Sequence, residues 1–155
     1  MAPPNVIPTR QVRVGVAAVI TGADGRVILG RRKGSNGDGQ YGFPGGHQEF
    51  GESHYECAER ETLEETGLRV KPTRVLAITN SVFDSEQHYI TIFVQCTQVD
   101  PDAQPQLLEP EKCYAWEFLS WDDIKRIMAC QPDELFLPIV KLLREYPNPE
   151  LFIEG

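Results

Sequence analysis

The stretch GHQEFGESHYECAERETLEETGL, residues 46–68, carries the strongest structural signal in this chain. Ser53 followed by Glu56 is typical of a capped helix start, and Gly67 is typical of a helix end. We therefore predict a helix over residues 53–66. The stretch also holds seven glutamates and one arginine, so it accounts for −6 of the chain's net charge of −8.

Three of these glutamates fall on one arc of the predicted helix. At 100° per residue, Glu61, Glu64 and Glu65 share a face, with ~6 Å of axial rise between the first and the last. A solvated acidic face is one interpretation, but such faces usually alternate with lysines, and here only Arg60 is present. Clustered carboxylates suit a hard divalent cation such as Mg²⁺ or Mn²⁺, and the lack of a His/Cys quartet argues against zinc.

The overall composition is that of an ordinary globular chain. Its 155 residues suit one domain, with 41% apolar and 25% charged residues. The net charge of −8 and the lack of a Lys/Arg run argue against a nucleic-acid polymer as partner, while a small phosphorylated ligand stays open. The four cysteines lack metal or disulfide spacing, and no segment suits an export signal or a bilayer span. We therefore expect reduced thiols, a cytoplasmic location and no membrane partner.

Strand patterns lie on both sides of the predicted helix. Residues 12–20 are rich in β-branched side chains, and residues 27–32 are expected to pair with them as a hairpin. Further strands are expected at residues 75–82, 88–99 and 114–121, helices at 121–129 and 134–145, loops at 34–39 and 100–110, and a flexible tail at 1–10. Runs of strands with one early helix and two late helices indicate an α+β fold.

The residues of the 46–68 stretch, taken in order, resemble the Nudix box, the signature of the Nudix hydrolases. That signature is Gly, five residues, Glu, seven residues and Arg-Glu-U-x-Glu-Glu-x-Gly-U, where U is aliphatic. All seven fixed positions match, at Gly46, Glu52, Arg60, Glu61, Glu64, Glu65 and Gly67. Thr62 stands at an aliphatic position, which removes no metal ligand. The resemblance implies a single Nudix domain over residues 1–155, folded as an α/β/α sandwich with a mixed β-sheet.

The resemblance also implies roles for the box residues. The expected ligands of Mg²⁺, or of Mn²⁺ as its substitute, are Gly45 through its carbonyl, Glu61, Glu64 and Glu65. The base that deprotonates the attacking water is expected to be Glu61 or a loop carboxylate, with Glu111 preferred over Glu109. Arg60 is expected to orient the glutamates. The structural positions of the box are Gly46, Glu52 and Gly67.

Short motifs outside the box are similar to a MutT-related subgroup of nucleoside-triphosphate pyrophosphatases with mammalian and plant cytosolic members. They lie at residues 30–35, 44–47, 109–112 and 135–136. The groups expected to contact substrate phosphates are Arg32, His47 and Lys112, each with the alternative of a merely solvated side chain. Phe136 is expected either to stack on a base or to belong to the core. Leu137 stands where the subgroup has Trp, and we expect it to line an apolar pocket with Phe43 and Phe136.

The activity implied by the resemblance is hydrolysis of a diphosphate linkage. The leading expectation is conversion of a nucleoside triphosphate, including modified or oxidised ones, to a nucleoside monophosphate and pyrophosphate. Two alternatives stay open: another diphosphate, such as a nucleotide sugar or a prenyl diphosphate, and a nucleotide-binding regulator without turnover. The intact box glutamates argue against the regulator, because binding alone needs no water-activating site. Analogy with the subgroup also suggests a homodimer.

Overall fold

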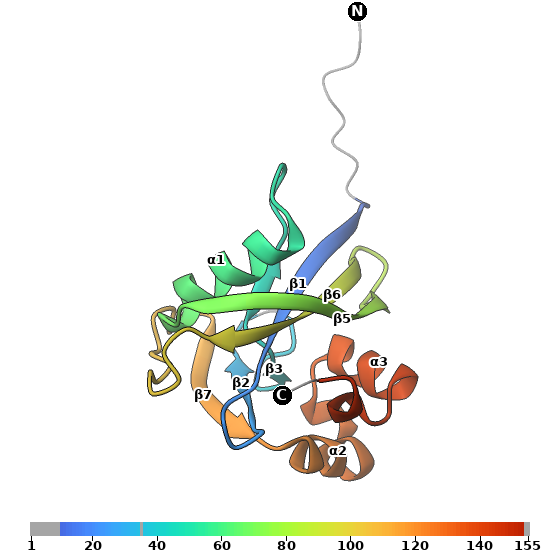
Figure 1. Ribbon diagram of the computed structural model, residues 1–155. Coiled ribbons are helices and arrows are strands. Elements are labelled where there is room, and N and C mark those ends of the chain that lie inside the picture. Colours follow the sequence, from blue (N-terminus) through green and yellow to red (C-terminus); the bar gives the residue numbers. More distant parts are fainter. Residues whose placement is uncertain (1–9, 35, 154–155) are drawn as a thin grey trace, which may run out of the picture.

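Two β-sheets form the centre of the protein (Figure 1). The computed structural model describes residues 10–34 and 36–153. The larger sheet has the strand order β4 (Gly45–His47), β1 (Val12–Ile20), β6 (His88–Gln98) and β5 (Val70–Val82), with β1 and β6 parallel. The smaller sheet is antiparallel, in the order β3 (Tyr41–Gly42), β2 (Val27–Arg32) and β7 (Cys113–Leu119).

Helices lie on both sides of these sheets. Figure 1 shows α1 (His54–Thr66) on one side, and α2 (Trp121–Cys130) and α3 (Leu137–Glu145) on the other. Two short 3₁₀ turns, Pro132–Glu134 and Pro149–Leu151, flank α3. The expected α+β fold, an α/β/α sandwich with a mixed β-sheet, is therefore confirmed.

The local sequence explains where α1 begins and ends. Ser53 caps its start, with Oγ accepting a hydrogen bond of 3.1 Å from the Glu56 N–H, and Gly67 ends it in the left-handed conformation at φ 74°. The helix predicted over residues 53–66 is confirmed to within one residue. Ala58 and Thr62 are fully buried, which anchors α1 on the larger sheet.

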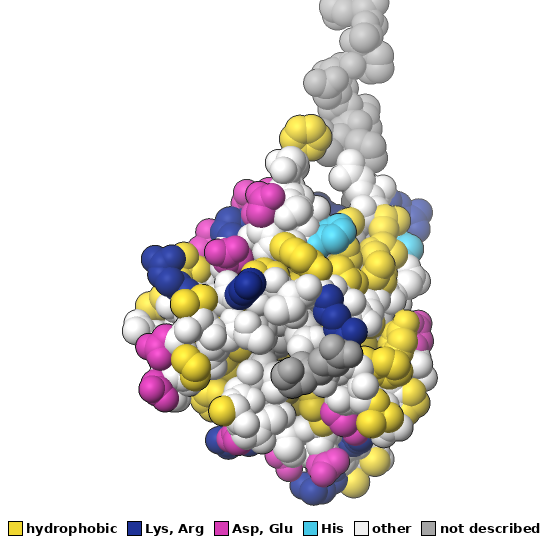
Figure 2. Space-filling view, viewed as in Figure 1, with side chains coloured by type: hydrophobic (Ala, Val, Ile, Leu, Met, Phe, Trp, Pro, Cys, Tyr) yellow, Lys and Arg dark blue, Asp and Glu magenta, His cyan; other side chains and the backbone are white. Residues whose placement is uncertain are grey.

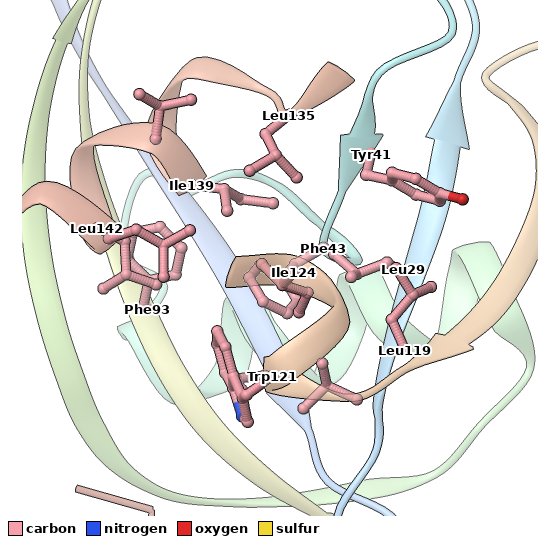
Figure 3. Close-up of a cluster of buried hydrophobic side chains, with 14 of the residues drawn as sticks. Leu29, Tyr41, Phe43, Phe93, Leu119, Trp121, Ile124, Leu135, Ile139 and Leu142 are labelled. Atoms are coloured by element: carbon pink, nitrogen blue, oxygen red, sulfur yellow. The ribbon is translucent and has the colours of Figure 1, made fainter. Parts of the chain in front are cut away.

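The second half of β1 is buried from both sides, because successive side chains of a strand point to opposite faces. Val16 and Ala18 pack beneath α1, whereas Val19 packs towards α2 and α3. The cluster on that second face includes Leu29, Phe43, Trp121, Ile124, Ile139 and Leu142 (Figure 3). β1 thus lies between the layer of α1 and the layer of α2 and α3. Its pairing with β4 fixes the position of β4 as well.

Two expectations about pairing and helix length are wrong. β2 does not form a hairpin with β1 beyond one isolated bridge, because β4 and β6 occupy the two edges of β1. β2 lies instead in the smaller sheet. The helix expected over residues 134–145 starts only at Leu137, since Leu135 is extended and forms a bridge with Tyr41.

The ends of the chain and its long edge strand complete the description. β5 begins at Val70, earlier than the strand expected at 75–82, and continues through two irregularities in its pairing with β6. The flexible tail expected over residues 1–10 lies outside the described residues, except for Arg10. That the chain forms a single domain over residues 1–155 stays a prediction. Within residues 10–34 and 36–153, no helix combines the length and the apolar character needed to cross a bilayer.

Candidate active site

A cleft of about 620 Å³ lies between the two sheets. Its charged side chains carry both signs and are Arg32, Lys33, Glu49, Glu61, Glu65, Glu109 and Lys112. The apolar part of its lining includes Phe43, Phe83, Tyr89, Phe93, Phe136 and Ile139. On the face drawn in Figure 2, acidic and basic side chains lie close together, with apolar side chains between them. Such a cleft suits a ligand that is anionic at one end and apolar at the other.

Two glycines of β4 let α1 approach the sheet closely. A Cβ on Gly45 would collide with the carbonyl oxygen of Val16 on the neighbouring strand. A Cβ on Gly46 would lie 2.5 Å from Glu61 Oε1, which is closer than real Cβ contacts come. The Gly-Gly pair therefore does more than form a turn, because it allows the Glu61 carboxylate to lie directly on the β4 backbone.

Arg60 ties the acidic residues together. Its Nε and Nη2 donate to the two carboxylate oxygens of Glu52 at 2.6 and 3.0 Å, and its Nη1 lies 2.9 Å from Glu61 Oε1. Nη1 also reaches Glu64 Oε2 at 3.3 Å, and Nη2 donates to the His47 carbonyl at 3.2 Å. The guanidinium holds the pKa of Glu52 at about 2, and the carboxylates raise the pKa of Arg60. This network orients Glu61 towards the cleft.

Glu65 is the most strongly perturbed acid of the cleft. Burial raises its pKa to about 9, and the charges of Glu61 and Glu109 add to the shift. Glu65 also hydrogen-bonds to Glu61, whereas a backbone hydrogen bond from Gly45 opposes the shift. The metal-free protein therefore favours the neutral form of Glu65 more than an ordinary carboxyl group does.

The oxygen donors of this region fit a hard divalent cation. Among the described residues, no three His, Cys, Asp or Glu side chains converge into a complete metal cage. However, Glu61 and Glu65 are in contact, and Glu109 Oε1 is buried without a hydrogen-bond partner in the described part of the chain. Carboxylate oxygens are the donors that Mg²⁺ and Mn²⁺ prefer, with water completing the shell.

Cationic and switchable groups surround the acids. The pKa of Arg32 is lowered by burial, and its Nε donates to the Asn36 carbonyl at 2.9 Å. Lys112 Nζ lies 3.4 Å from Glu109 Oε2, and this carboxylate raises the lysine's pKa. His47 Nε2 lies 3.1 Å from the Tyr89 hydroxyl, and burial lowers the pKa of the imidazole. All three side chains line the cleft, and the lowered pKa of His47 favours its neutral form.

The structure brings most of the expected site residues to the cleft. Those that line it are Arg32, Phe43, Gly45, Gly46, Glu61 and Glu65, together with His47, Lys112 and Phe136. Glu52, Arg60 and Gly67 lie outside the lining, where they hold the loop and α1 in place.

Three expected site residues lie elsewhere. The Glu64 side chain is 52% exposed and is held by Arg60. Glu111 is exposed outside the cleft, and Glu109 takes the place expected for it. Leu137 packs against the core instead of lining the pocket. Sequence reasoning missed several lining residues, and among them are the aromatic residues Phe83, Tyr89 and Trp116.

Comparison with known proteins supports this description. A family model for the NUDIX domain matches residues 11–139. The m7GpppN-mRNA hydrolase NUDT17 of Xenopus laevis is 32% identical over 142 residues, which cover 83% of this chain and 48% of that protein. The chain spans about half the length of the NUDT17 relatives that it matches.

One further relative and one solved structure match this chain over most of both lengths. The RNA pyrophosphohydrolase of Pectobacterium carotovorum is 24% identical over 92% of this chain and 86% of that protein. The MutT protein structure from Methanosarcina mazei Go1 has a TM-score of 0.74 at 22% identity and covers 90% of this chain and 95% of that one. The structural likeness shows a shared fold.

Proposed function

Because this chain belongs to the Nudix hydrolase family, we propose that it hydrolyses a nucleoside triphosphate to the monophosphate and pyrophosphate, with Mg²⁺ as cofactor. The observation that carries the proposal is the contact between Glu61 and Glu65 in a cleft that also holds Arg32 and Lys112. Acidic groups that hold a cation and basic groups that hold phosphates are both needed for attack on a polyanion.

Each group has a role in this proposal. Glu61, Glu65 and the Gly45 carbonyl would hold the cation, with Glu64 reaching it through rotation of its exposed side chain. When bound, Mg²⁺ supplies charge neutralisation at the phosphates and a more acidic bound water, and Mn²⁺ can replace it. Arg60 keeps Glu61 oriented through its 2.9 Å contact. The basic groups on the cleft hold the phosphate chain in line with the attacking water.

The attacking water needs a base, and two carboxylates are suitably placed. Glu61 lies beside the proposed cation, and Glu109 lies near Glu65 on the cleft with one buried oxygen lacking a partner among the described residues. Glu111 is exposed outside the cleft, so we now prefer Glu109 as the loop candidate.

Other phosphoanhydrides form the second group of candidate substrates. The NUDT17 relative is named for hydrolysis of m7GpppN-mRNA, and this favours testing a cap dinucleotide. The apolar lining around Phe43 and Phe136 keeps nucleotide sugars and prenyl diphosphates as candidates. A small phosphorylated compound is the proposed partner in each case. The cytoplasmic location, the homodimer and the exclusion of nucleic-acid polymers stay predictions.

The decisive experiment is a substrate panel. The intact chain is incubated with nucleoside triphosphates, a cap dinucleotide, nucleotide sugars and prenyl diphosphates, with Mg²⁺ or with EDTA. Phosphate and pyrophosphate release is measured for the triphosphates and prenyl diphosphates, and nucleotide products are separated by chromatography for the cap dinucleotide and the nucleotide sugars. We expect Mg²⁺-dependent pyrophosphate release from triphosphates, and Glu65→Gln should lower it by orders of magnitude. The matched control is Glu59→Gln, an exposed position on the same helix. Ligand-induced thermal stabilisation without turnover under any divalent ion would favour the regulator.

A further inference from the structure

Four rings and one guanidinium form a continuous arc along one wall of the cleft. His47 stacks on Tyr89 at 5.4 Å between centroids, and Tyr89 meets Phe83 edge-to-face at 5.7 Å. Phe83 lies 5.3 Å from Phe136, and the Arg32 guanidinium lies 3.6 Å from the Phe136 ring centre. All five residues line the cleft, although they come from β4, β6, the β5–β6 turn, the start of α3 and β2.

The Phe136 ring is already engaged. Arg32 lies over it, and Gly37 packs so closely that a Cβ there would lie 3.0 Å from the ring. The Phe136 N–H is also fixed by a 2.9 Å hydrogen bond to the Tyr41 carbonyl. A ring held in this way is a support for the guanidinium, because the cation–π contact and the Asn36 hydrogen bond fix Arg32 in one position at the cleft wall.

Phe83 differs from its neighbours in the arc. Tyr89 stacks on the His47 imidazole, and Phe136 carries the Arg32 guanidinium. In the described part of the chain, the ring contacts of Phe83 are with Tyr89 and Phe136, and no cation lies over its ring. Its side chain is partly exposed on the cleft. It lies on the β5–β6 turn, and its contact with Phe136 places it beside the start of α3.

We propose that the arc divides its rings between two tasks: Phe83 stacks on a planar aromatic group of the substrate, and Phe136 acts as a positioning residue that holds Arg32 against the phosphates. This inference rests on the proposed function and narrows its substrate class. It favours nucleoside phosphates over prenyl diphosphates, because a flat π-face gains its extra contact energy from another flat ring. It also moves the stacking role from Phe136 to Phe83.

The experiment compares a nucleoside triphosphate with ribose 5-triphosphate, which has the same phosphate chain and no base. The ratio of the two kcat/KM values measures what the base contributes. We expect Phe83→Ala to lower this ratio by about 5- to 150-fold, the usual range for loss of one base–aromatic stack. Phe83→Trp should restore the ratio, whereas Phe83→Leu should not. Val82→Ala, at an exposed neighbouring position on β5, is the control that leaves the ratio unchanged.

The positioning role of Phe136 has its own signature. Phe136→Ala should raise KM for both substrates by the same factor and leave the ratio of their kcat/KM values unchanged. Phe136→Trp should restore KM to the value of the unaltered chain. In a double-mutant cycle with Arg32→Ala, the two losses should not add, because both remove the same contact to phosphate.

The outcomes separate this inference from the proposed function. If the unaltered chain hydrolyses neither triphosphate, the proposed function fails. If it hydrolyses both but Phe83→Ala or Phe83→Leu keeps the full ratio, the stacking role of Phe83 is wrong while the hydrolase stands. If Phe136→Ala lowers the ratio as Phe83→Ala was expected to do, the two rings have been assigned the wrong way round.

Discussion

The Gly46 backbone lies against the Glu61 carboxylate, so closely that a Cβ at position 46 would lie 2.5 Å from Oε1 and 2.7 Å from Oε2. Contacts of this length are forbidden to real side chains. The pairing of β4 with β1 holds the strand in place, and the second glycine, Gly45, lies so close to β1 that a Cβ there would collide with the Val16 carbonyl oxygen. The position of Glu61 in the cleft is therefore a consequence of the missing side chain at Gly46.

Gly46→Ala should displace Glu61 and disable the enzyme. We expect turnover to fall by at least an order of magnitude, because a carboxylate that misses its position by about 1 Å loses much of its catalytic effect. Circular dichroism should show a retained fold. The control is Gly22→Ala, at a turn outside the cleft where the nearest atom to a Cβ, 3.3 Å away, belongs to the flexible Asp24 side chain. Equal activity of the two variants would show that Glu61 tolerates displacement.

Glu52→Gln should reduce stability in a pH-dependent manner. The pKa of Glu52 is held at about 2 by Arg60, below its ordinary value of 4.5. A carboxyl group with a depressed pKa stabilises the folded state above its unfolded pKa, and this contribution is lost as the pH falls from 4.5 to about 2. The variant should thus be less stable than the unaltered chain by roughly 1 to 3 kcal/mol at pH 7, as expected for hydrogen bonds to charged groups.

Denaturant unfolding between pH 2 and pH 7 measures this difference. The two curves should converge towards pH 2, where Glu52 itself becomes protonated. A constant difference over the whole range would mean that the pair with Arg60 contributes no pH-dependent stability. Glu56→Gln, at an exposed position on the first turn of α1, is the matched control.

The predictable parts of this molecule are those set by local sequence. Ser53 and Gly67 mark the ends of α1 through hydrogen bonds and a backbone conformation that span only a few residues. The helix in turn fixes which box residues share a face. For these reasons α1, the contact of Glu61 with Glu65 and the link from Arg60 to Glu64 follow from spacing alone.

The remaining parts depend on contacts between distant segments. The sheet that β2 joins depends on which strands already flank β1, and nothing near residues 27–32 reveals this. The choice between Glu109 and Glu111 depends on how their loop turns, with the Lys112 N–H bonded back to the Glu109 carbonyl at 2.9 Å. Tyr89 is one of many alternating residues of β6, and which face of the sheet borders the cleft depends on how the two sheets pack, which no local pattern in β6 encodes.

Glu65→Gln should stabilise the metal-free protein while it removes activity. The pKa of Glu65 is raised to about 9, so the folded state increasingly resists its ionisation as the pH rises from 4.5, the ordinary value, towards 9. The amide has no such cost. With EDTA at pH 8, the variant should melt at least about 2 °C higher than the unaltered chain, the shift that about 1 kcal/mol produces at this size.

With Mg²⁺ present, we expect the unaltered chain to have a higher melting temperature than Glu65→Gln. Mg²⁺ should raise the melting temperature of the unaltered chain through binding to the folded state, and should raise that of Glu65→Gln much less. Differential scanning fluorimetry from pH 5 to pH 9, with EDTA and with Mg²⁺, measures both effects. A variant that is less stable than the unaltered chain at pH 8 in EDTA would mean that Glu65 is satisfied by its surroundings without a cation.

Glu109 and Glu111 lie two residues apart, and only Glu109 lines the cleft. If Glu109 deprotonates the attacking water, Glu109→Gln should lower kcat by about 100-fold or more, the usual contribution of a general base, with little change in KM. Glu111→Gln removes the same charge from the same loop but alters no residue of the cleft. Its rate should therefore stay close to that of the unaltered chain. Equal rates for Glu109→Gln and the unaltered chain would assign the proton transfer to Glu61, and a large loss with Glu111→Gln would require the loop to rearrange when substrate binds.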